Sequence, residues 1–179
     1  MKALREHRDN RVGRLHMALL LAAGLGSAAP AAAEGNEHPD LGSASEVSAI
    51  LGDLSTTGNL ADVRQLGDRN KATIDQSGNP NGSLILQDGS DNEATITQNG
   101  SDNVALINQI GSSNVANISQ NGSGNKAMIE QYNDLNAVEI IQTGNRNTAH
   151  INQMGGEGFK SVKQSGNDMT FSVSNPNAQ

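Results

Sequence analysis

The residues of this chain that could do chemistry are side-chain amides, and their spacing is regular. Gln occurs every eleven residues, ten times in succession. An amide is a poor acid or nucleophile, but it donates and accepts hydrogen bonds at the same time. The spacing therefore predicts stacked, hydrogen-bonded repeats rather than a catalytic centre, because a solenoid must place each slot above its copy. These glutamines are Gln65, Gln76, Gln87, Gln98, Gln109, Gln120, Gln131, Gln142, Gln153 and Gln164.

Other positions keep the same phase, and the unit reads Q-x-G-x-x-N-x-A-x-I-x. The Gly positions are Gly67, Gly78, Gly89, Gly100, Gly111, Gly122, Gly144, Gly155 and Gly166. The Asn positions are Asn70, Asn81, Asn92, Asn103, Asn114, Asn125, Asn136 and Asn147, with Asn59 one unit earlier. The apolar positions are Val63, Ile74, Ile85, Ile96, Ile107, Ile118, Ile129, Ile140, Ile151 and Val162.

The period within the unit predicts its local structure. Ala94, Ile96 and Gln98 alternate along the chain, which places them on one face of a β-strand. The x-Gly-x-x segment that follows predicts a tight turn, since Gly accepts positive φ. Two such 11-residue units form one 22-residue coil, with apolar residues facing each other. We expect an all-β fold, a β-solenoid with amyloid-like cross-β stacking and strands about 4.8 Å apart.

The inward amides explain the invariant spacing. A buried amide without a partner costs free energy, but stacked copies can donate to one neighbour and accept from the other. We expect Gln and Asn ladders along the solenoid. Asn108, between two inward positions, is expected to point outward, so that its replacement leaves the ladders intact.

The chain divides into four segments. Residues 1–33 combine five basic residues with an apolar stretch that ends in Ala31-Ala32-Ala33, which predicts a secretory signal peptide. Residues 34–58 are irregular and are expected to be a flexible pre-repeat segment, either a secretion tag or a plain leader. Residues 59–153 form the regular array, and residues 154–179 hold divergent final repeats and a tail. These last repeats either cap the solenoid or contact a partner or surface.

Composition argues against several functions. Only 2% of residues are aromatic and the chain has no Cys, so an ordinary globular core and disulfides are not expected. Removal of residues 1–33 takes five of 12 basic and two of 19 acidic residues, which leaves a net charge near −10. That charge argues against nucleic-acid binding. No acid–base cluster, metal-ligand pattern or calcium-binding nonapeptide occurs, so we expect no enzyme, cofactor, metal site or small-molecule substrate.

The unit resembles the curlin repeat of curli fibre subunits, from Asn59 to about Gln164. The resemblance implies an extracellular functional amyloid of Gram-negative biofilms. It also implies passage through the periplasm, export by a dedicated outer-membrane machinery, and end-on β-stacking with itself or a second curlin subunit at the cell surface.

Curlins comprise a major subunit and a minor, nucleating subunit. Every unit here carries the same A-x-I-x-Q-x-G pattern and the last unit diverges, which is more similar to the minor subunit. The major fibre-forming subunit is the first alternative. A soluble, capped β-solenoid binding module that does not polymerise is an alternative of another class.

Overall fold

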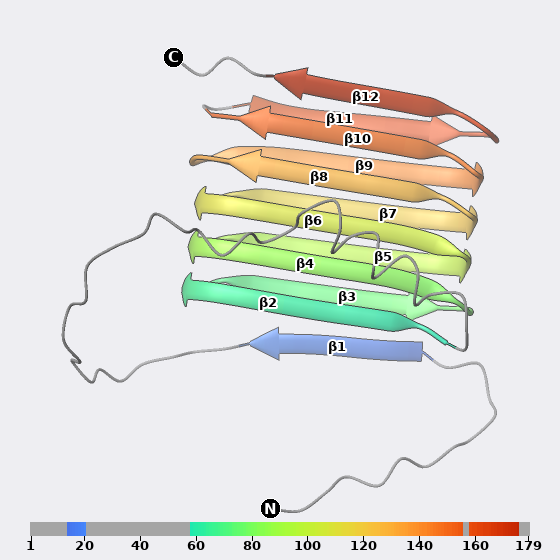
Figure 1. Ribbon diagram of the computed structural model, residues 1–179, viewed down its shortest axis with the longest axis horizontal. Helices are drawn as coiled ribbons and strands as arrows, with labels where there is room; N and C mark the ends of the chain where they lie inside the picture. Colours follow the sequence, from blue (N-terminus) through green and yellow to red (C-terminus); the bar gives the residue numbers. More distant parts are fainter. Residues whose placement is uncertain (1–13, 21–57, 156–157, 176–179) are drawn as a thin grey trace, which may run out of the picture.

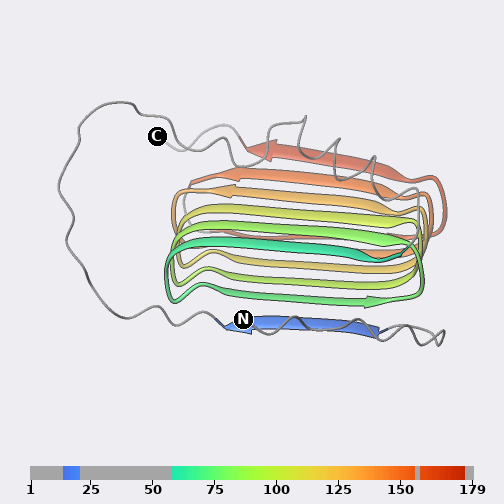
Figure 2. The same ribbon diagram turned by 60° about the horizontal axis from the view of Figure 1, so that its bottom comes forward.

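The computed structural model describes residues 14–20, 58–155 and 158–175 of the 179-residue chain. In these residues the chain winds into a β-solenoid of two facing sheets (Figure 1). The turned view shows the sheets as two layers that are joined by turns at both edges (Figure 2). The predicted all-β solenoid is therefore confirmed, with 22 residues between equivalent positions of neighbouring coils.

Odd-numbered strands form one sheet, here called sheet A, and even-numbered strands form the other, sheet B. The strands of sheet A are β1 (Arg14–Leu20), β3 (Lys71–Ser77), β5 (Glu93–Ser101), β7 (Val115–Ser123), β9 (Asn136–Asn145) and β11 (Gly158–Ser165). The strands of sheet B are β2 (Leu60–Asp68), β4 (Asn81–Ser90), β6 (Asn103–Ser112), β8 (Lys126–Tyr132), β10 (Thr148–Met154) and β12 (Thr170–Asn175).

The register of the parallel strands follows the repeat. Ile96 of β5 pairs with Ile118 of β7, and Ile107 of β6 pairs with Ile129 of β8. Strands β11 and β12 keep this register although their side chains depart from the pattern. Strand β1 differs, because it runs antiparallel to β3. It lies within the predicted signal peptide, most of which falls outside the described residues, as do residues 34–57.

The core is a thin seam between the sheets. Alternate strand positions point inward, so Ile and small residues from both sheets meet there. The repeat Ile side chains are at most 1% exposed. Burial of a side chain of this size contributes about 1.5–3 kcal/mol before the entropy of ordering is counted. The described residues contain no helix of sufficient length and apolarity to cross a membrane.

Candidate functional site: amide ladders and strand edges

The Gln side chains of sheet A form a continuous ladder. Gln76 Nε2 donates to Gln98 Oε1 at 2.9 Å, and Gln98 Nε2 donates to Gln120 Oε1 at 2.9 Å. The same contact continues to Gln142 at 2.9 Å and to Gln164 at 2.8 Å. All five side chains are buried. Each amide thus satisfies its neighbour one coil further along the chain.

Sheet B has a second Gln ladder that stops earlier. It runs from Gln65 through Gln87 and Gln109 to Gln131, with contacts of 2.6, 2.8 and 2.9 Å. Gln153 is buried at the next slot, but its Nε2 donates to the carbonyl of Gly158 at 2.9 Å. Within the described residues, Gln153 Oε1 accepts no hydrogen bond. The ladder is therefore interrupted where the divergent repeats begin.

The Gln side chains also connect the two sheets. Gln98 of β5 donates a further hydrogen bond to the backbone carbonyl of Gly82 on β4, at 3.0 Å. Gln120 of β7 donates to the carbonyl of Val104 on β6 at the same distance. Each of these Gln side chains therefore links neighbouring coils within one sheet and also links the two facing sheets.

The Asn side chains form ladders of the opposite direction. The backbone N and Nδ2 of Asn103 both donate to Asn81 Oδ1, at 3.2 and 3.1 Å. Asn103 Nδ2 also donates to the turn carbonyl of Gly122 at 2.8 Å. One column joins Asn59, Asn81, Asn103, Asn125 and Asn147, and the other joins Asn70, Asn92, Asn114 and Asn136. Gln donates toward the C-terminal end and Asn toward the N-terminal end, so the stack has a polarity.

Both Asn columns end where the repeat diverges. Gly158 and Met169 stand at the slots that follow Asn136 and Asn147. Met169 still donates its backbone N–H to Asn147 Oδ1 at 3.2 Å. Asn136 Oδ1 accepts no hydrogen bond within the part of the chain that is described. The last coil therefore keeps the backbone pairing, but only some of the buried amides of the preceding coil find hydrogen-bond partners in it.

The turn glycines are required by contact as well as by φ. Gly100 has φ of 122°, and a Cβ at this position would overlap the backbone carbonyl of Gly122 in the next coil. The other predicted turn glycines also have positive φ. Asn133, which takes the remaining Gly slot, has φ of 70°.

A second left-handed position occurs in eight of the turns and is not evident from the repeat pattern. It immediately precedes the slot of the ladder Asn and is occupied by different residue types. These residues are Arg69, Asp91, Asp102, Ser113, Gly124, Leu135, Arg146 and Asp168, all with φ between 53° and 67°. The three Asp and one Gly at this position could have indicated a positive φ, because both residue types tolerate that conformation. Leu135 and the two Arg do not favour it and therefore hide the pattern.

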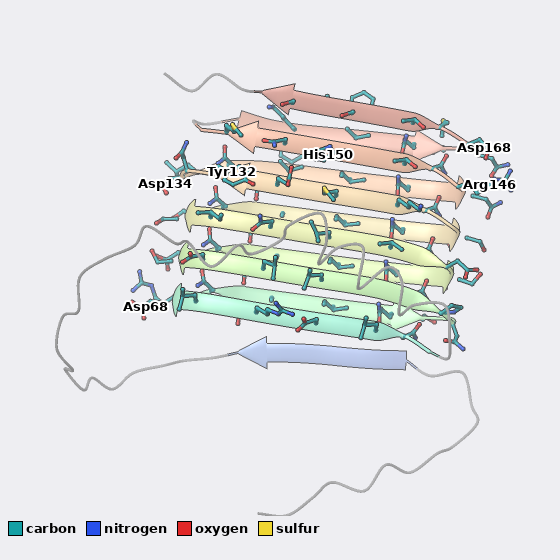
Figure 3. All side chains as sticks on the ribbon, viewed as in Figure 1. Asp68, Tyr132, Asp134, Arg146, His150 and Asp168 are labelled. Atoms are coloured by element: carbon teal, nitrogen blue, oxygen red, sulfur yellow. The ribbon has the colours of Figure 1, made fainter. Side chains whose placement is uncertain are left out.

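Four of these turn residues form two ion pairs between neighbouring coils. Arg69 binds Asp91 through two hydrogen bonds of 2.6 Å each, and Arg146 binds Asp168 through contacts of 2.6 and 2.8 Å. Figure 3 shows Arg146 and Asp168 together at one edge of the solenoid. Hydrogen bonding by the Arg partners lowers the pKa of the Asp91 and Asp168 carboxyl groups.

The outer faces of the two sheets differ. On sheet B, the outward side chains Leu84, Leu86 and Leu106 form a cluster and are only 1–6% exposed. Asn108 lies on the same outward face, between the inward Ile107 and Gln109, but it is only 5% exposed and is therefore buried rather than solvated. On sheet A the corresponding outward residues are mostly polar. An example is the column Thr73, Thr95, Asn117 and Glu139.

The ends of the solenoid present strand edges. Strand β2 begins sheet B and β12 ends it, whereas sheet A ends at β11. An unpaired strand edge offers N–H and C=O groups to another strand. At the N-terminal end, the buried Oε1 atoms of Gln65 and Gln76 accept no hydrogen bond from the described residues. Within those residues, no group of three His, Asp or Glu is placed to hold a metal ion.

Comparison with known families agrees with this geometry. The family model described as the curlin associated repeat matches residues 56–89, 67–100 and 89–122. No curated protein matches the chain in a sequence search. The matched segments cover strands β2 to β6 and most of β7, in which Gln side chains of neighbouring coils are hydrogen-bonded. Residues 56–122 are thus similar to the curlin associated repeat, and this repeat on a β-solenoid supports a curli-type structural subunit.

Proposed function

We propose that this chain is a structural subunit of an extracellular, curli-type amyloid fibre that serves adhesion and the biofilm matrix. The observation that carries the proposal is the polarity of the ladders together with the open strand edges. Gln65 and Gln76 present acceptors at one end of the stack, and the Gln–Gln hydrogen bonds of both ladders point toward the other end. A second chain added end-on supplies the missing donors and continues both sheets.

The proposed assembly uses no new type of contact. Within the chain, one coil binds the next through backbone pairing, an Ile contact and the amide ladders. Addition of a second subunit repeats the backbone pairing and the apolar contact across the boundary, whereas the divergent last repeats offer fewer amides to the ladders. A fibre formed in this way has strands perpendicular to its axis, which is the cross-β arrangement.

The subunit is proposed to be the minor, nucleating curlin. Both halves of each coil carry the same inward pattern, so both ladders are already formed within one chain. A single folded chain therefore presents a template edge. The divergent residues at β11 and β12 make the two ends unequal, which suits a seed with one better growing end.

The proposed route to the surface rests on the leader. Residues 1–33 serve as the signal peptide for entry into the periplasm of a Gram-negative bacterium. Residues 34–58 are then available to the outer-membrane export machinery. Residues 154–179 either cap the array or contact a partner. These assignments come from sequence composition and from the resemblance.

The proposal is tested by a thioflavin-T time course on purified Glu34–Gln179 at micromolar concentration and neutral pH. A rise in fluorescence with fibres is expected. Gln98→Ala should delay the rise, whereas the outward variant Thr97→Ala should leave it unchanged. A flat trace from a soluble, β-rich monomer would contradict the proposal and favour the capped binding module.

The nucleating role needs a separate test. A trace of preformed Glu34–Gln179 fibres is added to a major curlin subunit that has its own lag phase. Abolition of that lag is the expected result. Fibres of this chain that form only after a long lag, and that do not shorten the lag of the other subunit, would favour the major subunit instead.

A further inference from the structure

The number of strands in the array bears on how two copies can stack. From β2 to β12 the structure describes eleven strands, six in sheet B and five in sheet A. Sheet B therefore both opens and closes the array. Because the number of half-coils is odd, the array begins and ends in the same sheet. A second copy in the same orientation therefore cannot continue both sheets without a gap.

Two end-on arrangements can be compared. If the next copy keeps the same orientation, its β2 pairs with β12. The β11 edge of sheet A is then separated from the next copy's β3 by one empty strand position. If the next copy is rotated by half a turn about the solenoid axis, its β2 pairs with β11 and its β3 pairs with β12. No strand position is then empty.

We propose that successive copies in the fibre are related by a half-turn about the solenoid axis. This inference rests on the proposed fibre function. It requires the two halves of a coil to be interchangeable, and the inward positions meet this requirement. Both sheets place Asn, a small residue, Ile and Gln at the same spacing, and both form Gln ladders in the same direction.

The half-turn continues the core across the junction. It places Val63 of the next copy one coil beyond Val162, and Ile74 of the next copy one coil beyond Val173. Gln65 of the next copy follows Gln164, whose Oε1 already accepts from Gln142 at 2.8 Å. In the single chain Gln164 Nε2 donates to the carbonyls of Thr148 and Met169, each at 3.1 Å. The half-turn places it next to the open Oε1 of the next copy's Gln65, which then replaces the Met169 carbonyl as its acceptor and continues the direction of the ladder.

The charges in the turns give independent support. Arg146, Asp168 and Arg69 each stand four residues after a ladder Gln, namely Gln142, Gln164 and Gln65. The half-turn therefore places Arg69 of the next copy one coil beyond Asp168. The column then alternates in sign across the junction, from Arg146 to Asp168, then to Arg69 and Asp91 of the next copy. Without rotation, the position beyond Asp168 is empty.

Strand β1 occupies the edge that this arrangement needs. It pairs with β3 in the full chain, for example Met17 with Ile74. The half-turn assigns the same edge of β3 to β12 of the preceding copy. The two strands exclude each other, so a chain joins the fibre at this end only after β1 has left β3. Removal of residues 1–33 would have this effect.

Engineered disulfides can test the rotation, because the chain has no Cys. Asp62, Ser161 and Ser172 are outward residues near the two ends of the array. Each stands three residues before a Gln slot, at Gln65, Gln164 and Asn175. The half-turn brings Asp62 of one copy beside Ser161 of its neighbour, whereas the unrotated stack brings it beside Ser172. Neighbouring strand positions have the Cα spacing that a disulfide requires.

Fibres are collected from cells that express the full chain, so that processing is natural, and are oxidised, dissolved and run on a non-reducing gel. Asp62→Cys with Ser161→Cys should give a ladder of covalent oligomers, at least tenfold more than Asp62→Cys with Ser172→Cys. The reverse pattern, equal linking, or no linking within fibres would overturn the half-turn.

If the cysteine variants form no fibres while the unaltered chain does, helical symmetry in electron-microscopy images of unaltered fibres decides the question. A twofold screw with one copy per half-turn is expected, and a repeat without rotation would overturn the inference. Absence of fibres from the unaltered chain would instead refute the proposed function.

Discussion

The central coils and the last two strands have the same parallel backbone pairing, but they differ in how completely their buried amides are hydrogen-bonded. From β5 to β7, Asn, Ala, Ile and Gln occupy their inward slots and their amides contact the next coil. In β11 and β12, Gly158 and Met169 replace Asn, while Lys160 and Phe171 replace Ala. Parallel pairing nevertheless continues in the same register. Strand stacking thus needs only the spacing, whereas closure of the buried amides needs the particular side chains.

Replacement of a turn glycine should show the largest difference in lost folding stability between the central coils and the C-terminal end. Gly100→Ala should destabilise the fold by roughly 3 kcal/mol or more, because its Cβ overlaps the carbonyl of Gly122. Gly166→Ala has a similar φ of 135°, but its Cβ would meet only Met169 at 3.6 Å. We expect a cost of about 1 kcal/mol there, from backbone strain alone. Denaturant unfolding of the two variants checks this, and equal losses would show that stacking contact between glycines is unimportant.

The Gln ladder should show the next largest effect. Gln98→Ala removes the acceptor of Gln76 and the donor to Gln120, so it should cost about 2–4 kcal/mol. Thr97→Ala, outward on the same strand, should change stability by less than about 0.5 kcal/mol. Denaturation midpoints measure both effects. Similar losses at the two positions would mean that the inward amides do not hold the coils together.

The C-terminal coil should become more stable, and should elongate faster, when the repeat residue Ala is restored at position 160. Lys160 occupies an inward slot, and its Nζ is buried without a hydrogen-bond partner among the described residues. Lys160→Ala should stabilise the last coil by about 1 kcal/mol and accelerate fibre elongation at that end. Lys163→Ala, an exposed control on the same strand, should do neither. Elongation rates from seeded reactions provide the measurement, and slower growth of Lys160→Ala would contradict the expectation.

A smaller gain is expected in the turn before β9. Leu135 has φ of 60°, which is unfavourable for a branched apolar side chain, and it is 57% exposed. Leu135→Asn should therefore stabilise the chain by about 0.5–1 kcal/mol, since Asn tolerates this conformation. The thermal midpoint should rise. A fall would show that the Leu135 side chain makes contacts that outweigh its backbone strain.

The smallest effect concerns the ion pairs in the turns. The pKa of Asp91 and Asp168 is lowered by their Arg partners, so both pairs are intact above the usual Asp range. Their contribution is lost as the pH falls through the lowered pKa values. Side-chain NMR titration should show both carboxyls protonating below ordinary Asp residues. Titration at the ordinary Asp value in Arg146→Gln would identify Arg146 as the cause for Asp168.

The periodic features of the molecule could be predicted from sequence, whereas the others could not. Spacing was enough for the solenoid, because Ile96 and Ile118 must align if every unit has eleven residues. The left-handed position at Leu135 was not evident, since its conformation repeats although its residue type does not. The Leu84 cluster and the burial of Asn108 were also missed, because outward positions carry no repeating pattern.

X-ray diffraction from aligned fibres of Glu34–Gln179 would examine end-on stacking itself. Stacking predicts a meridional reflection near 4.7–4.8 Å, because the strands of all copies lie across the fibre axis at one spacing. A chain that stays monomeric and β-rich under conditions of seeding and high concentration, with no such reflection, would contradict it.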